Sequence, residues 1–332
     1  MRHLDVEGLG PVSVIGLGTW QFGSKEWGYG DSYANGAARD IVRRALDLGV
    51  TLYDTAEAYG FGRSERILGD ALGTRRHEVV VASKLFPVAP FPRLVRRSAT
   101  ASASRLGVSR IPLYQVHQPN PLVPDTVPMP ALRELVAEGT IGAVGVSNYS
   151  LERWRKADDA LAGDGPALPV VSNQVQFSLA HAGPLDDLVP FAEREHRLVI
   201  AYSPLAQGLL GGRYGPDHKP GGVRALNPLF GAENLQRVAP LLDVVREVAA
   251  GHATTPSAVA LAWLVAQPRV VVIPGASSVE QLESNVAAAD LALTADEVDA
   301  LTRAAREFRP VSGATTLVDG VKGRLASLRG RG

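Results

Sequence analysis

Short apolar runs rich in β-branched residues alternate with longer segments whose apolar residues recur at helical spacing. The runs predict eight strands, at residues 14–17, 51–53, 79–82, 113–116, 143–146, 171–175, 198–201 and 270–273. The segments between them predict helices at residues 37–48, 64–72, 94–106, 130–137, 151–160, 185–195, 235–250 and 255–266, with a further pair of helices after residue 278. This alternation is typical of βα units in a parallel sheet.

Eight such units predict an α/β fold, a closed (β/α)8 TIM barrel, although an open doubly wound sheet also fits the pattern. Residues 2–14 predict an N-terminal β-hairpin around a turn at residues 7–10. After strand seven, residues 207–234 are rich in glycine and proline and predict a long loop over one end of the barrel. No low-complexity linker divides the chain, so we predict one domain over residues 1–332.

The composition narrows the classes of protein. It is 45% hydrophobic and 20% charged, which is ordinary for a globular protein with a large core. The formal net charge is zero and no basic run is interleaved with aromatic residues, so we predict no nucleic-acid partner. No apolar run reaches membrane-spanning length and the N-terminus lacks a secretory signal pattern, so we expect a cytoplasmic protein without a membrane partner. A homo-oligomer stays open.

Two residue types limit the chemistry. The chain has no cysteine, which excludes disulfides, thiolate nucleophiles and cysteine-ligated metals. The seven histidines are scattered, and only His117 ends a predicted strand. A metal-dependent hydrolase is therefore disfavoured, and we predict no metal site.

Polar side chains follow the predicted strands. In a barrel of this kind the carboxyl ends of the strands meet at one rim, which carries the catalytic groups. A lone polar residue at a strand end is more often a cap or turn former than a catalytic group. Here, however, seven strand ends carry such residues, which predicts a site: Thr19, Trp20, Asp54, Lys84, His117, Ser147, Asn148, Gln174, Gln176, Tyr202 and Ser203, with Tyr59 in the loop after Asp54.

This set of side chains suits one kind of chemistry. A tyrosine hydroxyl has a pKa near ~10, which is high for acid–base work at neutral pH. A neighbouring ammonium lowers that pKa, and Lys84 is the candidate, with Asp54 as the carboxylate that holds it. His117 can hydrogen-bond a carbonyl oxygen. Together these groups suit protonation of an oxygen that gains negative charge, as a carbonyl does when hydride adds to its carbon.

Eight short stretches, in this order, resemble the aldo-keto reductase superfamily. They are GLGTW at 16–20, YDTAEAYG at 53–60, ASKL at 82–85, LYQVH at 113–117, GVSN at 145–148, NQVQ at 173–176, YSPLA at 202–206 and IPGASS at 273–278. They lie between residues 12 and 288, nearly the whole chain. Each stretch alone is a weak signal, whereas the ordered set is specific.

The resemblance implies NADPH-dependent reduction of an aldehyde or ketone by a catalytic tetrad of Asp54, Tyr59, Lys84 and His117. Family members hold NADPH extended across the barrel, and the chain indeed lacks a G-x-G-x-x-G fingerprint. The implied cofactor contacts are Thr19, Trp20, Asp54, Ser147, Asn148, Gln174, Tyr202, Ser203, Leu205, Gln207, Gly208 and Gly275. The expected substrate contacts are Trp20, Trp27, Tyr29, Tyr59, Phe86 and His117, whose aromatic rings suit bulky or ring-bearing carbonyls.

The segment after strand eight predicts the adenosine end of the cofactor site. Ser278 and Gln281 are spaced like a capping box, and the helix start offers N–H groups and a positive dipole end to a phosphate. By family position, Ser277, Gln281 and Asn285 contact the adenosine half. Arg213 and Arg224, in the long loop, are candidates for the 2′-phosphate. Position 284 is serine where many relatives carry glutamate, which leaves the preference for NADPH over NADH open.

Two other functions fit the same residues. Lys84 can form a Schiff base with a carbonyl substrate, as in a class I aldolase. The superfamily also includes channel-associated subunits that hold NADPH and turn over slowly, so a regulatory protein is the second alternative. A glycosidase is disfavoured because Asp54 and Glu57 come from one loop rather than from facing strands.

Overall fold

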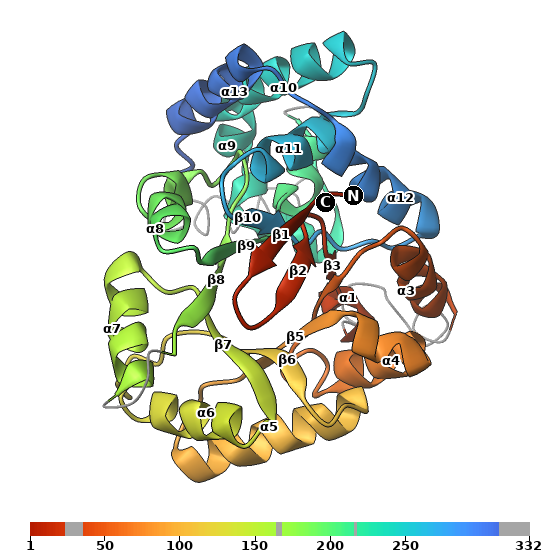
Figure 1. Ribbon diagram of the computed structural model, residues 1–332. Helices are drawn as coiled ribbons and strands as arrows, with labels where there is room; N and C mark the ends of the chain where they lie inside the picture. Colours follow the sequence, from red (N-terminus) through yellow and green to blue (C-terminus); the bar gives the residue numbers. More distant parts are fainter. Residues whose placement is uncertain (24–35, 164–167, 216–217, 312–332) are drawn as a thin grey trace, which may run out of the picture.

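Eight parallel strands form a closed barrel in the computed structural model, which describes residues 1–23, 36–163, 168–215 and 218–311 (Figure 1). In sheet order, the strands are β3 (Leu17–Gly18), β4 (Leu52–Asp54), β5 (Val80–Leu85), β6 (Ile111–Val116), β7 (Ile141–Ser147), β8 (Val170–Gln176), β9 (Leu198–Tyr202) and β10 (Val270–Val272). The first and last strands meet, because Gly16 N–H donates to Val272 O at 2.8 Å and Val272 N–H donates to Val14 O at 2.9 Å. The predicted barrel is confirmed, and the open sheet is excluded.

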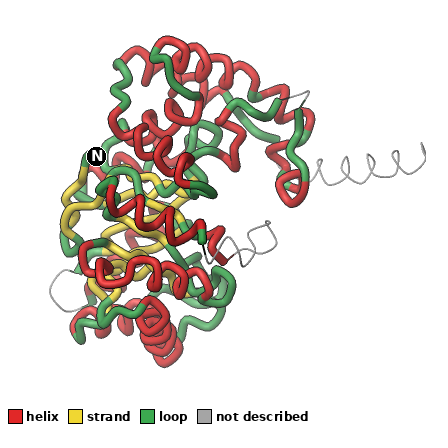
Figure 2. Tube along the Cα trace, turned by 90° about the vertical axis from the view of Figure 1, so that its right-hand side faces the viewer, coloured by secondary structure: helices red, strands yellow, loops and turns green. Residues whose placement is uncertain are grey.

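Helices cover the outside of the barrel (Figures 1 and 2). They are α1 (Trp20–Gly23), α3 (Ala37–Asp47), α4 (Arg63–Leu72), α5 (Pro92–Leu106), α6 (Pro128–Ala137), α7 (Leu151–Ala162), α8 (Leu188–Arg194), α9 (Ala232–Arg237), α10 (Ala239–Gly251), α11 (Pro256–Val265), α12 (Val279–Ala287) and α13 (Ala295–Glu307). Thr255 caps α11, accepting the Ala258 N–H at 3.2 Å, as its Thr-Pro start predicts. No single helix among the described residues could span a membrane; α10 and α11 pass only as a pair bent by 95°.

The predicted hairpin closes the amino-terminal end of the barrel, at the centre of Figure 1. It consists of β1 (His3–Val6) and β2 (Gly10–Ser13), paired antiparallel. Val6 and Val12 are buried in the same apolar cluster as the barrel interior. The hairpin thus covers the amino ends of the strands, and the polar side chains that follow the strands lie at the opposite end of the barrel.

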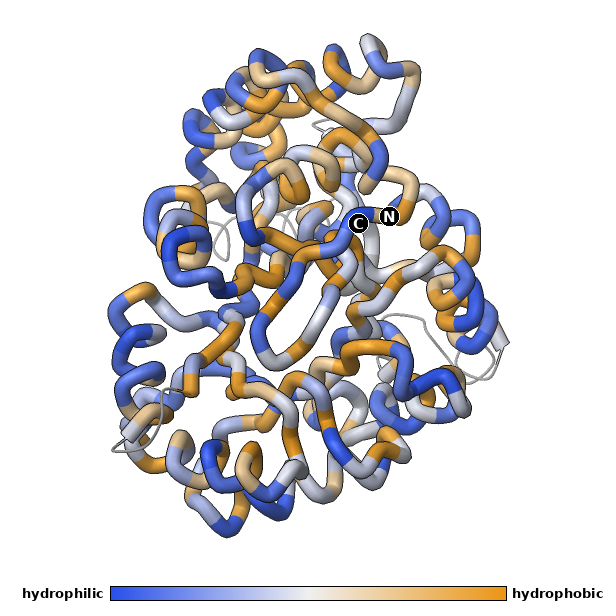
Figure 3. Tube along the Cα trace, in the orientation of Figure 1, coloured by the Kyte–Doolittle hydropathy of each residue, from blue (hydrophilic) through white to orange (hydrophobic). Residues whose placement is uncertain are grey.

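Apolar side chains form two layers, one on each side of the sheet. The inner layer includes Leu52, Leu113 and Ile200, and the larger outer layer lies between the strands and the helices. Hydrophilic and hydrophobic residues alternate along the outer helices, which face solvent on one side (Figure 3). Each fully buried aliphatic side chain contributes about 1.5–3 kcal/mol, so the two layers hold the strand ends in fixed positions.

Most element boundaries differ from the predictions by one to three residues, and four differences are larger or change the kind of element. Strand one is shorter, with β3 preceded by an isolated bridge at Ile15. The predicted helix 235–250 is two helices that meet at Val238, because Pro240 has no N–H to continue the first one. The helix predicted at 185–195 begins at Leu188, after a 3-10 turn. The long loop contains 3-10 helices η4 (Ala206–Gly211), η5 (Gly222–Leu226) and η6 (Pro228–Phe230). That residues 1–332 form one domain stays a prediction.

Candidate active site

A buried ion pair lies at the carboxyl ends of β4 and β5. Lys84 Nζ donates to both carboxylate oxygens of Asp54 at 2.7 Å and to the carbonyl oxygen of Thr55 at 2.9 Å. The side chains of Lys84 and Asp54 are 0% and 4% exposed. Gln174 Nε2, from β8, donates to Asp54 Oδ1 at 2.7 Å, so the carboxylate is held from both sides of the barrel. A buried pair of this kind costs desolvation energy, and only good geometry with further hydrogen bonds offsets that cost.

Tyr59 brings its phenol to the same ammonium. Lys84 Nζ lies 3.2 Å from Tyr59 Oη and 4.9 Å from the centroid of its ring. The loop after it has a left-handed backbone at Gly60, Phe61 and Gly62. Gly23 packs against it so closely that a Cβ there would lie 2.6 Å from Tyr59 C. This packing fixes the loop that carries the phenol.

The protonation states follow from burial and charge. Burial is the largest single influence on Lys84 and disfavours its charged form, but Asp54 and Tyr59 together outweigh it and raise the pKa of Lys84. Burial also disfavours the charged form of Tyr59 and so raises its pKa, whereas the charge of Lys84 lowers it by a smaller amount. The prediction that Lys84 gives Tyr59 a lowered pKa is therefore wrong as to the net shift. The effect of Lys84 has the expected sign, but the loss of water around the phenol outweighs it.

His117 follows β6 and faces Tyr59 across the mouth of the barrel. The two rings meet edge to face with their centroids 5.6 Å apart, and the ring of Phe86 meets His117 in the same way at 6.2 Å. Burial, with the charge of Lys84 added, lowers the pKa of His117 to about 3. The imidazole is therefore neutral at physiological pH.

A second polar group lies at the ends of β7, β8 and β9. Tyr202 Oη donates to Asn148 Oδ1 at 2.9 Å, and Asn148 Nδ2 donates to Ser147 Oγ at 3.1 Å. Ser147 Oγ in turn donates to the carbonyl oxygen of Gln174 at 2.9 Å. Asn148 has a φ of 61°, a left-handed conformation that asparagine tolerates better than most residues. The structure thus brings together four of the implied cofactor contacts, Ser147, Asn148, Gln174 and Tyr202, with the Gln174 amide directed at Asp54.

The segment that leads into α12 lies beside Gly18 of β3. Ser278 Oγ accepts the Gln281 N–H at 3.3 Å, which confirms the predicted N-cap. The reciprocal half of the capping box is wrong, because Gln281 Oε1 accepts from the N–H and Oγ of Ser277 instead. Asn285 Nδ2 donates to Gly275 O at 3.3 Å. Thr19 is buried and donates to Asp54 O at 2.8 Å, so its hydroxyl supports β4 from within the protein.

The segment after β9 turns sharply over the same face. Ser203, Ala206 and Gln207 have positive φ angles of 50°, 47° and 57°, and Gly208 follows at 96°. Leu205 is half-buried in the outer apolar layer. Further along the loop, Arg213 is exposed and Arg224 is half-buried in η5.

The opposite side of the mouth is apolar. Among the described residues, every exposed large hydrophobic side chain lies beyond the carboxyl end of a strand, in a loop or the first turn of a helix: Trp20, Phe61, Phe86, Val88, Phe91, Leu94, Leu122 and Leu226. Trp20 and Phe86 are the two predicted substrate contacts among them, 39% and 49% exposed. Trp27 and Tyr29, also predicted as substrate contacts, lie outside the described residues.

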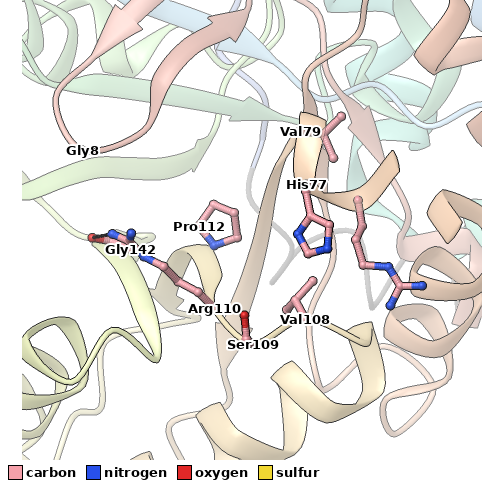
Figure 4. Close-up of a pocket in the computed structure, with 9 residues that line it drawn as sticks. Gly8, His77, Val79, Val108, Ser109, Arg110, Pro112 and Gly142 are labelled. Carbon is pink, nitrogen blue, oxygen red and sulfur yellow. Dashed lines mark hydrogen bonds between the residues drawn. The ribbon is translucent and has the colours of Figure 1, made fainter. Parts of the chain in front are cut away.

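A pocket of about 230 Å³ opens at the other end of the barrel (Figure 4). Its lining includes Gly8 of the hairpin turn and residues at the start of the strands, such as Pro112 and Gly142. Arg76, which also lines it, donates to backbone carbonyls at the end of α5 and so acts as a helix cap. None of the predicted site residues lies there, so this pocket is separate from the candidate site.

Two supporting groups were not predicted from the sequence. Tyr149 Oη donates to Asp125 Oδ1 at 2.6 Å, and Arg153 Nε donates to Asp125 Oδ2 at 2.8 Å, which anchors the residue next to Asn148. Gln21 Nε2 donates to Ala276 O at 2.9 Å and ties α1 to the segment before α12. In the sequence these residues appear only as isolated polar positions near loops, which do not indicate their partners. The part of the chain that the structure describes contains no cluster of His, Asp and Glu that could hold a metal ion.

Comparison with known proteins identifies the family. The aldo/keto reductase family model matches residues 14–306. The chain is 67% identical over 326 residues to an uncharacterized oxidoreductase of Mycobacterium tuberculosis, covering 98% of this chain and 99% of that protein. The solved structure of the glycerol dehydrogenase AKR11B4 from Gluconobacter oxydans matches with a TM-score of 0.83 and 28% identity, covering 94% of this chain and 97% of that one.

A second solved structure carries a cofactor. The aldo-keto reductase from Klebsiella pneumoniae in complex with NADPH matches with a TM-score of 0.73 and 29% identity, covering 91% of this chain and 94% of that one. The chain therefore belongs to the aldo/keto reductase family of oxidoreductases.

Proposed function

We propose that this protein reduces an aldehyde or ketone, with NADPH as the hydride donor and Tyr59 as the proton donor. The observation that carries the proposal is the position of the Lys84 ammonium, which is held by Asp54 and lies 3.2 Å from the phenol oxygen. An ammonium group only donates hydrogen bonds. Tyr59 Oη is therefore an acceptor toward Lys84, and its own hydrogen is free to point toward the mouth.

The proton-transfer step follows from this arrangement. Hydride addition to the carbonyl carbon gives an alkoxide, which takes the phenol proton. The positive charge of Lys84 stabilises the phenolate that is left, and Asp54 keeps that lysine charged. The raised pKa of Tyr59 does not prevent the step, because an alkoxide is far more basic than a phenolate. His117, being neutral, can donate one N–H to the carbonyl oxygen and orient it.

The polar half of the mouth suits NADPH. Ser147, Asn148 and Tyr202 supply hydroxyl and amide groups for the carboxamide and an aromatic ring for the nicotinamide. The start of α12 offers backbone N–H groups to a phosphate, and the left-handed turn through Gln207 and Gly208 is the proposed neighbour of the pyrophosphate. NADPH bound there supplies the hydride. Arg213 and Arg224 are the proposed ligands of its 2′-phosphate.

The adenosine half of the cofactor is assigned to α12. Ser277 and Gln281 are exposed and bonded to each other, so both can exchange that bond for one to the ligand. Asn285 is buried and tied to Gly275, which positions it for a contact rather than leaving it mobile. The hydroxyls of Thr19 and Ser147 are buried and donate to backbone carbonyls, so either must exchange that bond or act as an acceptor to contact the cofactor.

The apolar half of the mouth indicates the substrate class. Phe86 contacts His117, and Trp20, Val88 and Leu122 are exposed in loops or in the first turn of a helix at the same end of the barrel. A carbonyl compound with an aromatic or alkyl body would bury this surface, with a gain of about 25 cal/mol per Å² of apolar area. We therefore expect ring-bearing or long-chain aldehydes and ketones to be preferred over short ones.

The Schiff-base alternative has less support. A lysine that attacks a carbonyl must be neutral, whereas Lys84 has a raised pKa and gives its hydrogens to Asp54, Thr55 and Tyr59. Borohydride trapping tests the point, since a covalent adduct on Lys84 without a nicotinamide cofactor would favour a lyase.

A panel of aldehydes and ketones with NADPH and with NADH, followed by absorbance at the nicotinamide band, tests the proposed function. We expect NADPH to be consumed with aromatic aldehydes, and NADH more slowly. Binding of NADPH without consumption by any carbonyl would instead support a regulatory, nucleotide-holding protein. Faster use of NADH than of NADPH would overturn the assignment of Arg213 and Arg224.

A further inference from the structure

Glu57 is a carboxylate at the mouth that neither the proton transfer nor the cofactor site uses. Its side chain is 18% exposed, and its Oε1 accepts the backbone N–H of Phe86 at 2.6 Å. Its own N–H donates to the carbonyl oxygen of Lys84 at 3.4 Å. One residue thus ties the loop that carries Tyr59 to the end of β5 and to the first residue beyond it.

These bonds complete a ring of contacts around the mouth. The ring of Tyr59 meets His117, and the ring of His117 meets Phe86. Phe86 is bonded through its backbone to Glu57, which precedes Tyr59 by two residues. The side chain of Glu57 therefore fixes how far the Phe86 wall stands from the phenol.

A second layer of charges holds Glu57 in place. Arg105 Nη2, from α5, lies 3.9 Å from Glu57 Oε2, and Arg105 Nε donates to Glu65 Oε2 at 2.5 Å. Glu65 is fully buried and accepts a hydrogen bond from Ser83 Oγ, also at 2.5 Å. Ser83 is the neighbour of Lys84 in β5, so the network is anchored to the strand that carries the ammonium. A carboxylate held by this network has little freedom to release Phe86.

We propose that Glu57 is a positioning residue that sets the Phe86 wall of the substrate site relative to Tyr59 and His117. It acts through Phe86 and touches no reacting atom. The inference rests on the proposed function, because it assigns Phe86 to the substrate site of that reaction. It predicts that Glu57 determines how a bulky substrate is oriented, while a substrate too short to reach Phe86 is little affected.

The experiment compares Glu57→Ala with Glu57→Gln, using an aromatic aldehyde and a two-carbon aldehyde. We expect Glu57→Ala to raise KM for the aromatic aldehyde about tenfold and KM for the short one by less than about twofold, since one hydrogen bond to a charged acceptor is lost. Glutamine keeps an acceptor oxygen at the same reach, so Glu57→Gln should restore KM to within about threefold. Equal effects on both substrates, or no rescue by glutamine, would overturn the inference.

Two further variants separate positioning from general damage. Glu152→Ala removes an exposed carboxylate of α7 that pairs with Lys156, and should leave both KM values unchanged. Phe86→Ala should raise KM for the aromatic aldehyde, and adding Glu57→Ala to it should raise KM no further, because Glu57 acts through Phe86. Additive losses would contradict that route.

Amide hydrogen exchange at Phe86 tests the hydrogen bond between the Phe86 N–H and Glu57 Oε1, and it requires no turnover. The Phe86 N–H should exchange slowly in the native protein and in Glu57→Gln, and about tenfold faster in Glu57→Ala. An unchanged exchange rate of the Phe86 N–H in Glu57→Ala would mean that Glu57 does not hold Phe86, whatever the activity of the enzyme. If the native protein consumes no NADPH with any carbonyl, the proposed function fails while the exchange result still stands.

Discussion

The two halves of the barrel mouth hold their polar groups in different ways. On the β4–β6 side, Lys84 and Asp54 are buried, and each is bonded to fixed partners. On the side of β7, β9 and α12, Asn148 and Tyr202 are half-buried and bonded to each other, and Gln281 is exposed. The first arrangement is complete before any ligand arrives, whereas the second consists of groups that can exchange partners with a ligand.

This difference assigns different kinetic consequences to the two halves. A pre-assembled charge pair stabilises the transition state, so its loss should lower kcat. Groups that bind a cofactor should change its affinity first. The largest effect is therefore expected from the loss of the buried charge pair.

Lys84→Met should lower kcat by about a thousandfold, because the phenolate of Tyr59 loses its neighbouring cation. It also leaves the Asp54 carboxylate buried without a counter-charge, although Gln174 still donates to it, which should cost about 3–5 kcal/mol of unfolding free energy. Denaturant unfolding and steady-state kinetics measure the two effects separately.

The matched control is the double variant Lys84→Met/Asp54→Asn, in which the orphaned charge is removed. It should regain most of the stability and none of the turnover. Recovery of kcat to within about tenfold of the native enzyme would show that the cation is not needed.

His117→Asn should make the protein less sensitive to acid. The folded pKa of His117 is about 3 and the unfolded value is about 6.5, so the unfolded chain binds more protons between these values. Stability therefore falls as pH falls through this window, and at pH 5 this one residue costs about 2 kcal/mol relative to pH 7.

Urea unfolding at pH 7 and pH 5 measures the contribution of His117 to the pH dependence of stability. The native protein should lose more stability between the two pH values than His117→Asn does. His181, whose pKa is also lowered by burial, remains in both proteins and cancels in the comparison. Identical losses in the two proteins would mean that His117 is solvated and titrates normally.

Tyr202→Phe should weaken NADPH binding about threefold to tenfold, with a smaller change in kcat. It keeps the ring but removes the hydrogen bond that orients Asn148. Tyr114→Phe is the matched control, since Tyr114 is buried in the outer apolar layer away from the mouth. A larger fall in kcat than in NADPH affinity would contradict the assignment of cofactor binding to this half of the mouth.

The barrel was predictable because the signal repeats. Alternating strand and helix patterns depend on core packing, and the structure follows them from β4 to β10. The structure departs from the pattern where a proline interrupts a helix, as at Pro240, where a helix predicted as continuous is broken. The position of the strand ends follows from the same pattern, which explains why Asp54, Lys84 and His117 could be placed on one rim.

Partners across the barrel were less predictable. The bond between Gln174 and Asp54 joins residues 120 positions apart, and no local pattern encodes it. The net pKa of Tyr59 depends on how much water the fold removes, so only the sign of the Lys84 contribution could be predicted from the sequence. Glu57 lies within a recognisable motif, but its contact with Phe86 appears only when two loops are side by side.

Tyr59→Phe, assayed for NADPH binding and for turnover on one sample, tests the central claim most directly. The variant removes a single oxygen from the loop and leaves the Lys84–Asp54 pair in place. We predict that the NADPH Kd changes by less than about threefold while kcat with an aromatic aldehyde falls about a thousandfold. A variant that keeps at least about a tenth of the native kcat would show that another group delivers the proton.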